Sequence, residues 1–206
     1  MIDFLERRLA GQLPGKEAQR QMMPFERMEE RFNPELLRNA RPSGVLVAFY
    51  QKDDEWCIPL TQRHDYSGPH SGQVSFPGGK MEEEDNTIRL TALREAQEEV
   101  GILPNDVRIV GQLSDLYIPP SNFRVTPVVG VLEHPPEFAL NDFEVKELIE
   151  VPLSLLQDKE TVKRKDIKIQ NGFMSNVPYF DVYGKVVWGA TAMMLSELLS
   201  IIKDWE

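Results

Sequence analysis

The stretch that decides the fold reads Phe76-Pro77-Gly78-Gly79-Lys80-Met81-Glu82-Glu83-Glu84-Asp85-Asn86-Thr87-Ile88-Arg89-Leu90-Thr91-Ala92-Leu93-Arg94-Glu95-Ala96-Gln97-Glu98-Glu99-Val100-Gly101-Ile102. A glycine pair leads through an acidic turn into a predicted helix. Thr87 is the expected N-cap, and Gly101 is expected to end the helix. Leu93, Ala96 and Val100 recur at helical spacing, so this face of the helix is expected to pack inward.

Three carboxylates occupy a different face of the same predicted helix. Glu95, Glu98 and Glu99 lie three and four residues apart, where like charges repel by about 0.2–0.5 kcal/mol per pair without a counter-ion. Oxygen ligands gathered beside a glycine-rich turn are suited to a hard divalent cation. The alternative interpretation is an acidic helix face that simply meets solvent.

The same stretch resembles the Nudix box, the motif of the Nudix hydrolases, which cleave nucleoside diphosphates linked to another group. Counted from Gly79, the acidic position of the motif falls on Asp85, and one extra residue precedes the second half. That insertion leaves the role of Asp85 open. The second half of the motif is matched completely, by Arg94, Glu95, Ala96, Glu98, Glu99, Gly101 and Ile102.

The resemblance implies an α/β fold, the Nudix α/β/α sandwich with a mixed β-sheet. It also implies that helix glutamates hold Mg²⁺ or Mn²⁺ beside the diphosphate of the substrate, so that water attacks one phosphorus. Glu95 and Glu99 are the first candidates for metal ligands, followed by Glu98 and by the Gly79 carbonyl. Arg94 is expected to pair with Glu98 one turn later.

A second motif precedes the first and concerns the substrate. Leu60, Thr61, Arg63, Gly72 and residues 76–79 fall at the spacing of the coenzyme A pyrophosphatase branch of the Nudix hydrolases, which they resemble. We expect the Arg63 guanidinium to contact a phosphate, the alternative being a surface salt bridge. The chain departs from that branch where Pro59, His64 and Gly68 replace a leucine, a small residue and a second arginine.

An additional catalytic acid is expected from the segment Asp142-Phe143-Glu144-Val145. The segment is similar to an Asp-Glu-Val step in the coenzyme A branch, with a phenylalanine between the acids, and Glu144 is the candidate. The alternative is a solvated loop acid. The basic run Lys163-Arg164-Lys165 is expected to be a solvated face, with phosphate docking as the alternative.

Residues 1–43 are expected to form an N-terminal helical extension and residues 44–206 the Nudix domain. Apolar patterning predicts strands at 45–50, 56–61, 107–113, 116–118, 125–132, 145–151, 167–169 and 177–180, and a final amphipathic helix over 193–202. Met22, Met23, Phe25, Met28 and Phe32 are expected to pack on the main domain. A homodimer surface is the alternative, since methionine-rich faces serve as adaptable contacts.

Composition narrows the possible partners and the cellular compartment. The chain has 206 residues, a net charge of −10 and one cysteine, Cys57, expected to be a small buried hydrophobe. The negative charge argues against non-specific nucleic-acid binding, and no apolar run has the length of a membrane span. A lone cysteine suits a reducing cytoplasm, and no signal peptide is expected.

The function predicted on this basis is metal-dependent hydrolysis of a diphosphate bond. Coenzyme A or an acyl derivative would give adenosine 3′,5′-bisphosphate and 4′-phosphopantetheine. ADP-ribose or another nucleoside diphosphate derivative is the alternative substrate, and a non-catalytic metabolite-binding Nudix module is the alternative from another class. The expected site has Glu98, Arg94 and Glu144 as catalytic residues, Arg63, Gly78 and Gly79 as substrate-binding residues, and Glu95, Glu98 and Glu99 as metal ligands.

Overall fold

A central strand organises the molecule. The computed structural model describes residues 1–24, 32–66, 70–169 and 172–205. Strand β1 (Arg41–Lys52) pairs in parallel with β7 (Phe123–Leu132) along most of its length. It also pairs antiparallel with β4 (Gly78–Lys80) near its start and with β2 (Glu55–Arg63) at its end.

The other strands extend this sheet on both sides, in the order β3-β2-β1-β7-β5, with β6 on β7 and β8 on β2. The β1–β7 pair is parallel and the other pairs are antiparallel, so the predicted mixed sheet is confirmed. The β5–β7 pairing has a register shift between Ile109 and Gly111. The remaining bounds are β3 (Val74–Ser75), β5 (Val107–Gln112), β6 (Leu116–Ile118) and β8 (Val145–Pro152).

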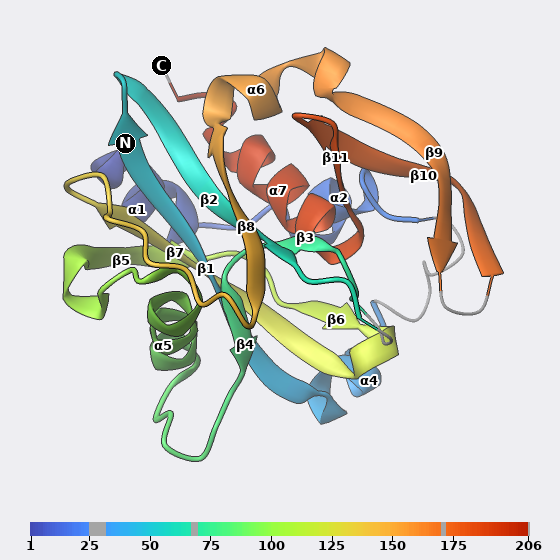
Figure 1. Cartoon of the computed structure of the whole chain (residues 1–206), viewed down its shortest axis with the longest axis horizontal. Helices are drawn as coiled ribbons and strands as arrows, with labels where there is room; N and C mark the ends of the chain where they lie inside the picture. The colour runs from blue at the N-terminus through green and yellow to red at the C-terminus, as the bar shows by residue number, and fades with distance from the viewer. Residues whose placement is uncertain (25–31, 67–69, 170–171, 206) are drawn as a thin grey trace.

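A second, three-stranded sheet follows, made of β9 (Val162–Ile169), β10 (Gly172–Val182) and β11 (Lys185–Trp188). The basic run expected to be a solvated face lies on the exposed strand β9. Lys163 pairs with Asp181 at 2.7 Å. Figure 1 shows these strands projecting away from the main sheet.

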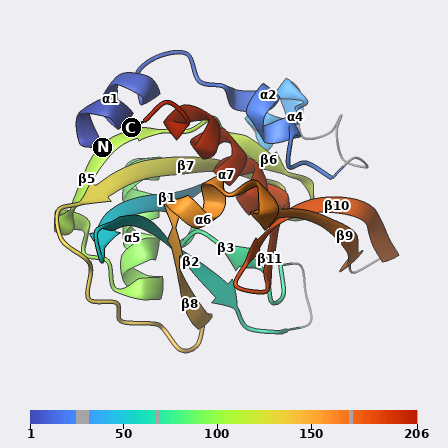
Figure 2. The same cartoon turned by 90° about the horizontal axis from the view of Figure 1, so that it is seen from above.

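Helices cover both faces of the main sheet. Figures 1 and 2 show α5 (Ile88–Val100) on one face and α7 (Gly189–Ile202) on the other, together with α1 (Ile2–Leu9) and α2 (Gly15–Arg20). This is the predicted α/β/α sandwich. Two short helices, α4 (Pro34–Asn39) and α6 (Leu153–Gln157), and three-residue 3₁₀ turns at Pro104–Asp106, Pro119–Ser121 and Lys159–Thr161 complete the described elements.

The alternating side chains of β1 supply both cores of the sandwich. Val45, Val47 and Phe49 pack in the cluster beneath α7, whereas Leu46, Ala48 and Tyr50 pack in the cluster beneath α5. Successive residues of a strand point to opposite faces, and a strand covered on both sides is apolar throughout. The continuous apolar run at 45–50 therefore correctly predicted a central strand.

The final helix is buried on nearly all sides, so the amphipathic pattern expected over 193–202 is wrong. The N-terminal helices cover its outer face, and a helix enclosed in this way is apolar around its circumference. Its one carboxylate, Glu197, is fully buried. Glu197 accepts hydrogen bonds from Gly15 N at 3.1 Å, Gln19 Nε2 at 2.8 Å and Ser114 N at 3.2 Å.

These contacts fasten the first residues to the sandwich. Met22 and Met23 are buried in the chain's own core, as the packing hypothesis predicted, so these two methionines do not form a dimer surface. Phe25 and Met28 lie outside the described residues.

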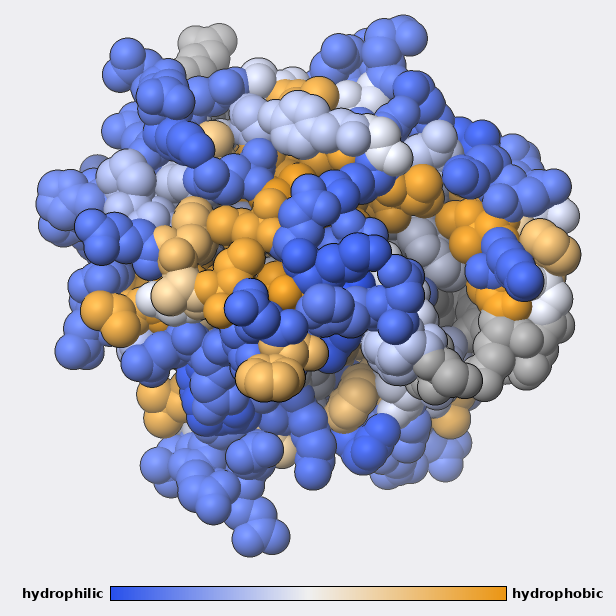
Figure 3. All heavy atoms as spheres, in the orientation of Figure 1, coloured by the Kyte–Doolittle hydropathy of each residue, from blue (hydrophilic) through white to orange (hydrophobic). Residues whose placement is uncertain are grey.

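On the face shown in Figure 3, hydrophobic residues gather in a band across the left and centre, with hydrophilic residues on both sides of it. Within the described residues, no helix has the length and apolar character needed to cross a membrane.

Candidate active site

Helix α5 is fixed at both ends by the residues that the sequence indicated. The Thr87 side chain accepts a hydrogen bond from Leu90 N at 3.3 Å, and Gly101 ends the helix with φ at 77°. Ala96 and Val100 are fully buried and Leu93 is half-buried. The first turn lies so close to β1 that a β-carbon on Gly44 would be 2.7 Å from Ile88 O. Close packing on this strand therefore sets the orientation of the helix.

The carboxylate of Glu99 is buried, with 3% of the residue exposed. Burial raises its pKa to about 7, while the charge of Arg63 and the Gly78 N–H oppose the rise. The Gly78 N–H donates to Glu99 Oε2 at 3.2 Å. The glycine turn and the helix are thus joined through a carboxylate that lacks an ion-pair partner among the described residues.

Glu95 lies one turn earlier, against the glycine turn. A β-carbon on Gly79 would overlap the Glu95 carboxylate, so glycine is required there for this approach. Burial raises the pKa of Glu95, and the charges of Glu98 and Glu144 add to the rise, against the effect of Arg94.

Arg94 connects the acidic turn to the helix. It forms a two-pronged ion pair with Asp85, through Nε–Oδ1 at 3.1 Å and Nη2–Oδ2 at 2.9 Å. Its Nη1 lies 2.9 Å from Glu95 Oε1 and 3.1 Å from Glu98 Oε2, and Nη2 donates to Lys80 O at 3.2 Å. The expected ion pair between Arg94 and Glu98 is present. Asp85 is a second partner of Arg94, which the sequence did not predict.

Asp85 is buried, and Arg94 is the main reason that its pKa falls to about 2. The Glu82 N–H also donates to Asp85 Oδ2 at 3.0 Å, which closes the acidic turn. The one-residue insertion left the role of Asp85 open in the sequence. The structure shows that the turn accommodates the extra residue, and that Asp85 still forms an ion pair with Arg94.

Glu98 differs from the other two helix glutamates. Its side chain is 55% exposed and paired with Arg94. At 3.6 residues per turn, consecutive residues point about 100° apart. Glu98 is therefore the most exposed of the three glutamates and Glu99 the most buried, while the charge of Glu98 still raises the pKa of Glu95.

Glu144 adds a third carboxylate near Glu95 and Glu99, which we call the inward pair. It stands in the loop before β8, and its charge raises the pKa of both Glu95 and Glu99. Asn141, which sequence reasoning missed, attaches this loop to α5: its N–H donates to Glu99 O at 3.0 Å and its side chain donates to Glu144 Oε1 at 3.3 Å. The Asx-turn chemistry of an asparagine two to three residues before the acid is the available signal.

Arg63 is the last residue of β2. It is opposite Val145, the residue after Glu144, in the β2–β8 pairing. The charge of Arg63 lowers the pKa of Glu99, yet within the described ranges its guanidinium has no hydrogen-bond or ion-pair partner.

The two histidines make local contacts. His64 Nε2 lies 2.9 Å from Asp142 O, and His70 Nδ1 lies 2.9 Å from Gln73 Oε1. Gly68, in the place of the second arginine, lies outside the described residues.

A divalent cation fits the chemistry of this site. Glu95, Glu99 and Glu144 supply hard oxygen donors that repel one another, which a cation would relieve. Among the side chains that the structure describes, no three acidic, histidine or cysteine residues form a ready ligand cage. Mg²⁺ rarely has such a cage, because it usually keeps several waters and binds one or two carboxylates together with substrate phosphates.

The Gly79 carbonyl accepts a hydrogen bond from Ser43 Oγ at 2.6 Å, which leaves it a second lone pair.

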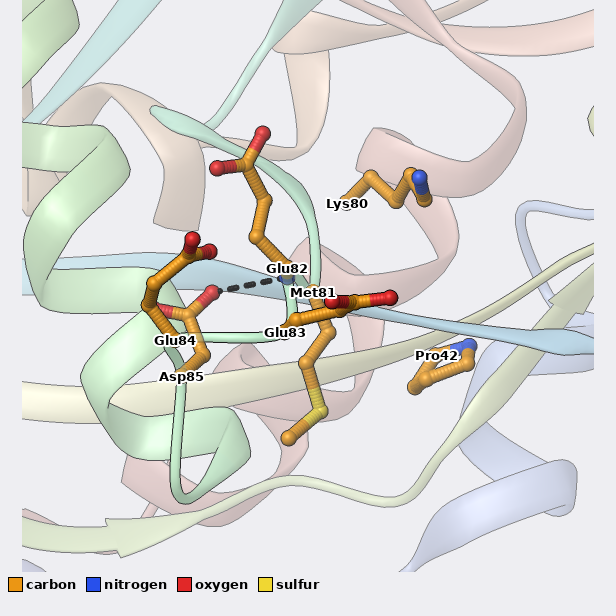
Figure 4. A pocket seen from close by; sticks show the side chains of 7 residues that line it. All are labelled: Pro42, Lys80, Met81, Glu82, Glu83, Glu84 and Asp85. Carbon is orange, nitrogen blue, oxygen red and sulfur yellow. Dashed lines mark hydrogen bonds between the residues drawn. The ribbon is translucent and has the colours of Figure 1, made fainter.

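A hollow lies on the outer side of the acidic turn, as Figure 4 shows. Its lining includes Lys80 and three glutamates, Glu82, Glu83 and Glu84, with the Glu82–Asp85 hydrogen bond at its edge. The inward carboxylates and Arg63 do not line it. We therefore place the active site at Glu95 and Glu99 rather than in this hollow.

Comparisons with known proteins agree with this geometry. The NUDIX domain model matches residues 40–169. The Nudix hydrolase NudL of Yersinia enterocolitica is 35% identical over 161 residues, which cover 78% of this chain and 80% of the relative. NudL of Pectobacterium atrosepticum is 39% identical over 146 residues, which cover 70% of this chain and 74% of the relative. The crystal structure of RenU, a Nudix hydrolase from M. smegmatis, superposes with a TM-score of 0.57 at 15% identity, covering 81% of this chain and 88% of that one.

Proposed function

Because this chain belongs to the Nudix hydrolases, a family of pyrophosphohydrolases that act on nucleoside diphosphate derivatives, we propose that it cleaves coenzyme A or an acyl derivative. The products are adenosine 3′,5′-bisphosphate and (acyl-)4′-phosphopantetheine. The observation that carries the proposal is the guanidinium of Arg63, which has no ion-pair partner among the described residues and whose charge acts on Glu99. Arg63 belongs to the motif, Leu60 to Gly79, that resembles the coenzyme A branch.

In this proposal Glu95 and Glu99 would hold a divalent ion, Mg²⁺ or Mn²⁺, next to the diphosphate of the substrate. A bound divalent ion lowers the pKa of water and neutralises charge on phosphoryl oxygens. Arg94 holds Glu95 and Glu98 in place through its ion pairs, a positioning role that affects metal affinity. The Gly78–Gly79 turn, which the Glu95 carboxylate approaches closely, is the part of the chain that we expect to contact the diphosphate.

Glu144 is our first candidate for accepting the proton of the attacking water, because it stands in the loop before β8 and its charge acts on both Glu95 and Glu99. Glu98, exposed beside Arg94, is the second candidate. As water bonds to one phosphorus, the bond from that phosphorus to the bridging oxygen breaks and the leaving phosphate takes the electron pair. Arg63 binds phosphate charge in the ground state and the transition state.

ADP-ribose or another nucleoside diphosphate derivative is the second candidate substrate. The observation in its favour is Gly68, which replaces the second arginine of the coenzyme A motif and so removes a fork suited to phosphate. A cytoplasmic location is also part of the proposal, based on the single, free Cys57.

Product analysis with a panel of diphosphate compounds tests the substrate. We expect coenzyme A to give the two named products, and cleavage of ADP-ribose alone would refute the coenzyme A assignment. A complete absence of hydrolysis in the presence of either metal would favour a binding module instead.

Arg63→Ala tests the contact. KM for coenzyme A is expected to rise about tenfold with little change in kcat, because the contact is present in both ground and transition states. Dephospho-coenzyme A, without the 3′-phosphate, is expected to be affected less. Arg89→Ala, at an exposed position on α5, is the matched control. Equal weakening of both coenzyme forms would place Arg63 away from the 3′-phosphate.

A further inference from the structure

Phe143 presents its aromatic side chain to solvent at the edge of the active site. It is 94% exposed, the highest value among the described large hydrophobic residues that are exposed. Single exposed apolar residues are common on proteins, so exposure alone decides nothing. Two further observations distinguish Phe143. Hydrogen bonds hold its backbone, and its neighbours in the chain are tied to the active site.

The loop that carries Phe143 is tied together by Asn141. Its Oδ1 accepts the Phe143 N–H at 3.1 Å. Its carbonyl accepts the N–H groups of Glu144 at 3.0 Å and Val145 at 2.9 Å. Such a turn fixes the backbone of Phe143 and leaves its side chain exposed. Because the backbone is already ordered, a ligand that binds the ring has only the side-chain rotamers of Phe143 left to order.

The same loop is attached to the active site at two points. Asn141 N donates to Glu99 O at 3.0 Å, and His64 Nε2 lies 2.9 Å from Asp142 O. The residue after Phe143 is Glu144, whose charge acts on both Glu95 and Glu99. The ring therefore belongs to the rim of the site, one residue away from the carboxylate that faces the inward pair.

We propose that Phe143 is a substrate-binding residue that stacks on the purine base of the nucleoside diphosphate substrate. This inference rests on the proposed function and adds the group that recognises the base. A base offers a flat π-face to an aromatic ring, and such stacking is a sequence-tolerant source of affinity. The loop that carries the ring is hydrogen-bonded to the backbone of Glu99, one of the carboxylates assigned to the diphosphate, so the attached nucleoside is expected to pass this loop.

Steady-state kinetics with the adenine-containing substrate that wild type cleaves best provide the first test. Phe143→Ala is expected to raise KM about tenfold and to leave kcat within about twofold, because stacking on the base contributes equally to ground and transition states. Phe143→Trp is expected to keep KM at or below the wild-type value. Phe173→Ala removes a ring that is 70% exposed on β10 and serves as the matched control. If Phe143→Ala has the same KM as Phe173→Ala, the proposal is refuted.

Binding of ADP provides a readout that does not depend on hydrolysis. By calorimetry, Phe143→Ala is expected to bind ADP about tenfold more weakly than wild type or Phe173→Ala. The indole introduced by Phe143→Trp is expected to lose fluorescence when ADP is added. A raised KM with unchanged ADP affinity would show that the ring contacts the other half of the substrate, which overturns the base assignment.

The two proposals fail in distinguishable ways. If wild type hydrolyses no nucleoside diphosphate compound, the proposed function fails, whereas the ADP measurement still tests the stacking. The melting temperature of Phe143→Ala is expected to equal that of wild type, because the side chain is almost fully exposed. A lowered melting temperature would show a structural role and contradict the assignment.

Discussion

Replacing Glu99 by Gln is expected to abolish hydrolysis and, without metal, to stabilise the protein. In the fold the Glu99 carboxyl has a pKa of about 7, against an ordinary value of 4.5. The folded protein therefore binds this proton more tightly than the unfolded chain. The resulting stabilisation is complete below about pH 4.5 and is lost as the pH rises through about 7.

The magnitude follows from the difference between the two pKa values. At 1.36 kcal/mol per tenfold change in proton affinity, ionising Glu99 costs the native state about 3 kcal/mol above pH 8, to order of magnitude. Glutamine has nearly the same shape and no charge, and its amide oxygen keeps an acceptor for the Gly78 N–H. The amide hydrogens of the glutamine have no assured acceptor, which offsets part of the gain from removing this cost. We therefore expect the unfolding free energy of Glu99→Gln to exceed that of wild type by about 1–2 kcal/mol above pH 8.

Urea unfolding with EDTA at about pH 5 and about pH 8 measures this effect. Glu99→Gln is expected to exceed wild type in unfolding free energy at the higher pH and to match it at the lower. Glu98→Gln, at the exposed neighbouring position, is expected to show no such dependence. A Glu99→Gln protein that is less stable than wild type at both pH values would refute the reasoning. Hydrolysis with saturating metal is expected to fall on the order of 100-fold or more.

Three other perturbations test neighbouring parts of the structure. Millimolar Mg²⁺ or Mn²⁺ is expected to raise the melting temperature of wild type. At a free metal concentration of 100 times Kd, the gain in unfolding free energy is about 2.7 kcal/mol. An equal shift of the melting temperature in Glu95→Gln would place the metal elsewhere. Asp85→Asn is expected to reduce hydrolysis about 10–100-fold by releasing Arg94. Because the pKa of Asp85 falls to about 2, its contribution to stability is present above about pH 4 and is lost as the pH falls, so acid titrations of the variant and wild type should converge near pH 2. Glu197→Ala is expected to cost at least about 3 kcal/mol, because three buried donors lose their acceptor; urea unfolding measures it, and a loss below about 1 kcal/mol would contradict the anchoring role.

Local sequence rules predicted the parts of the fold that depend on near neighbours. Thr87 and Gly101 define the helix ends, and the Arg94–Glu98 pair follows from their spacing. The apolar run at 45–50 predicted a strand buried on both faces, because no polar position interrupts it. Such features need no knowledge of the distant chain.

Long-range contacts limited the remaining predictions. The Asp85–Arg94 ion pair was hidden because the inserted residue displaced the acid from its usual spacing. The final helix was misjudged because its outer face is covered by residues nearly 200 positions earlier. Glu197, the one acid in that apolar helix, was the available signal, since a buried carboxylate needs partners.

The contact between Gly15 and Glu197 also has a consequence for synthesis of the chain, because it joins residues 182 positions apart. A ribosome adds about 5–20 residues per second, so on the order of 10–40 s separate the appearance of the first helices from that of their binding site. During this interval α2 lacks α7, the helix against which it packs in the finished molecule. Docking of α2 therefore follows the synthesis of α7, as a late step in the maturation of the newly made protein.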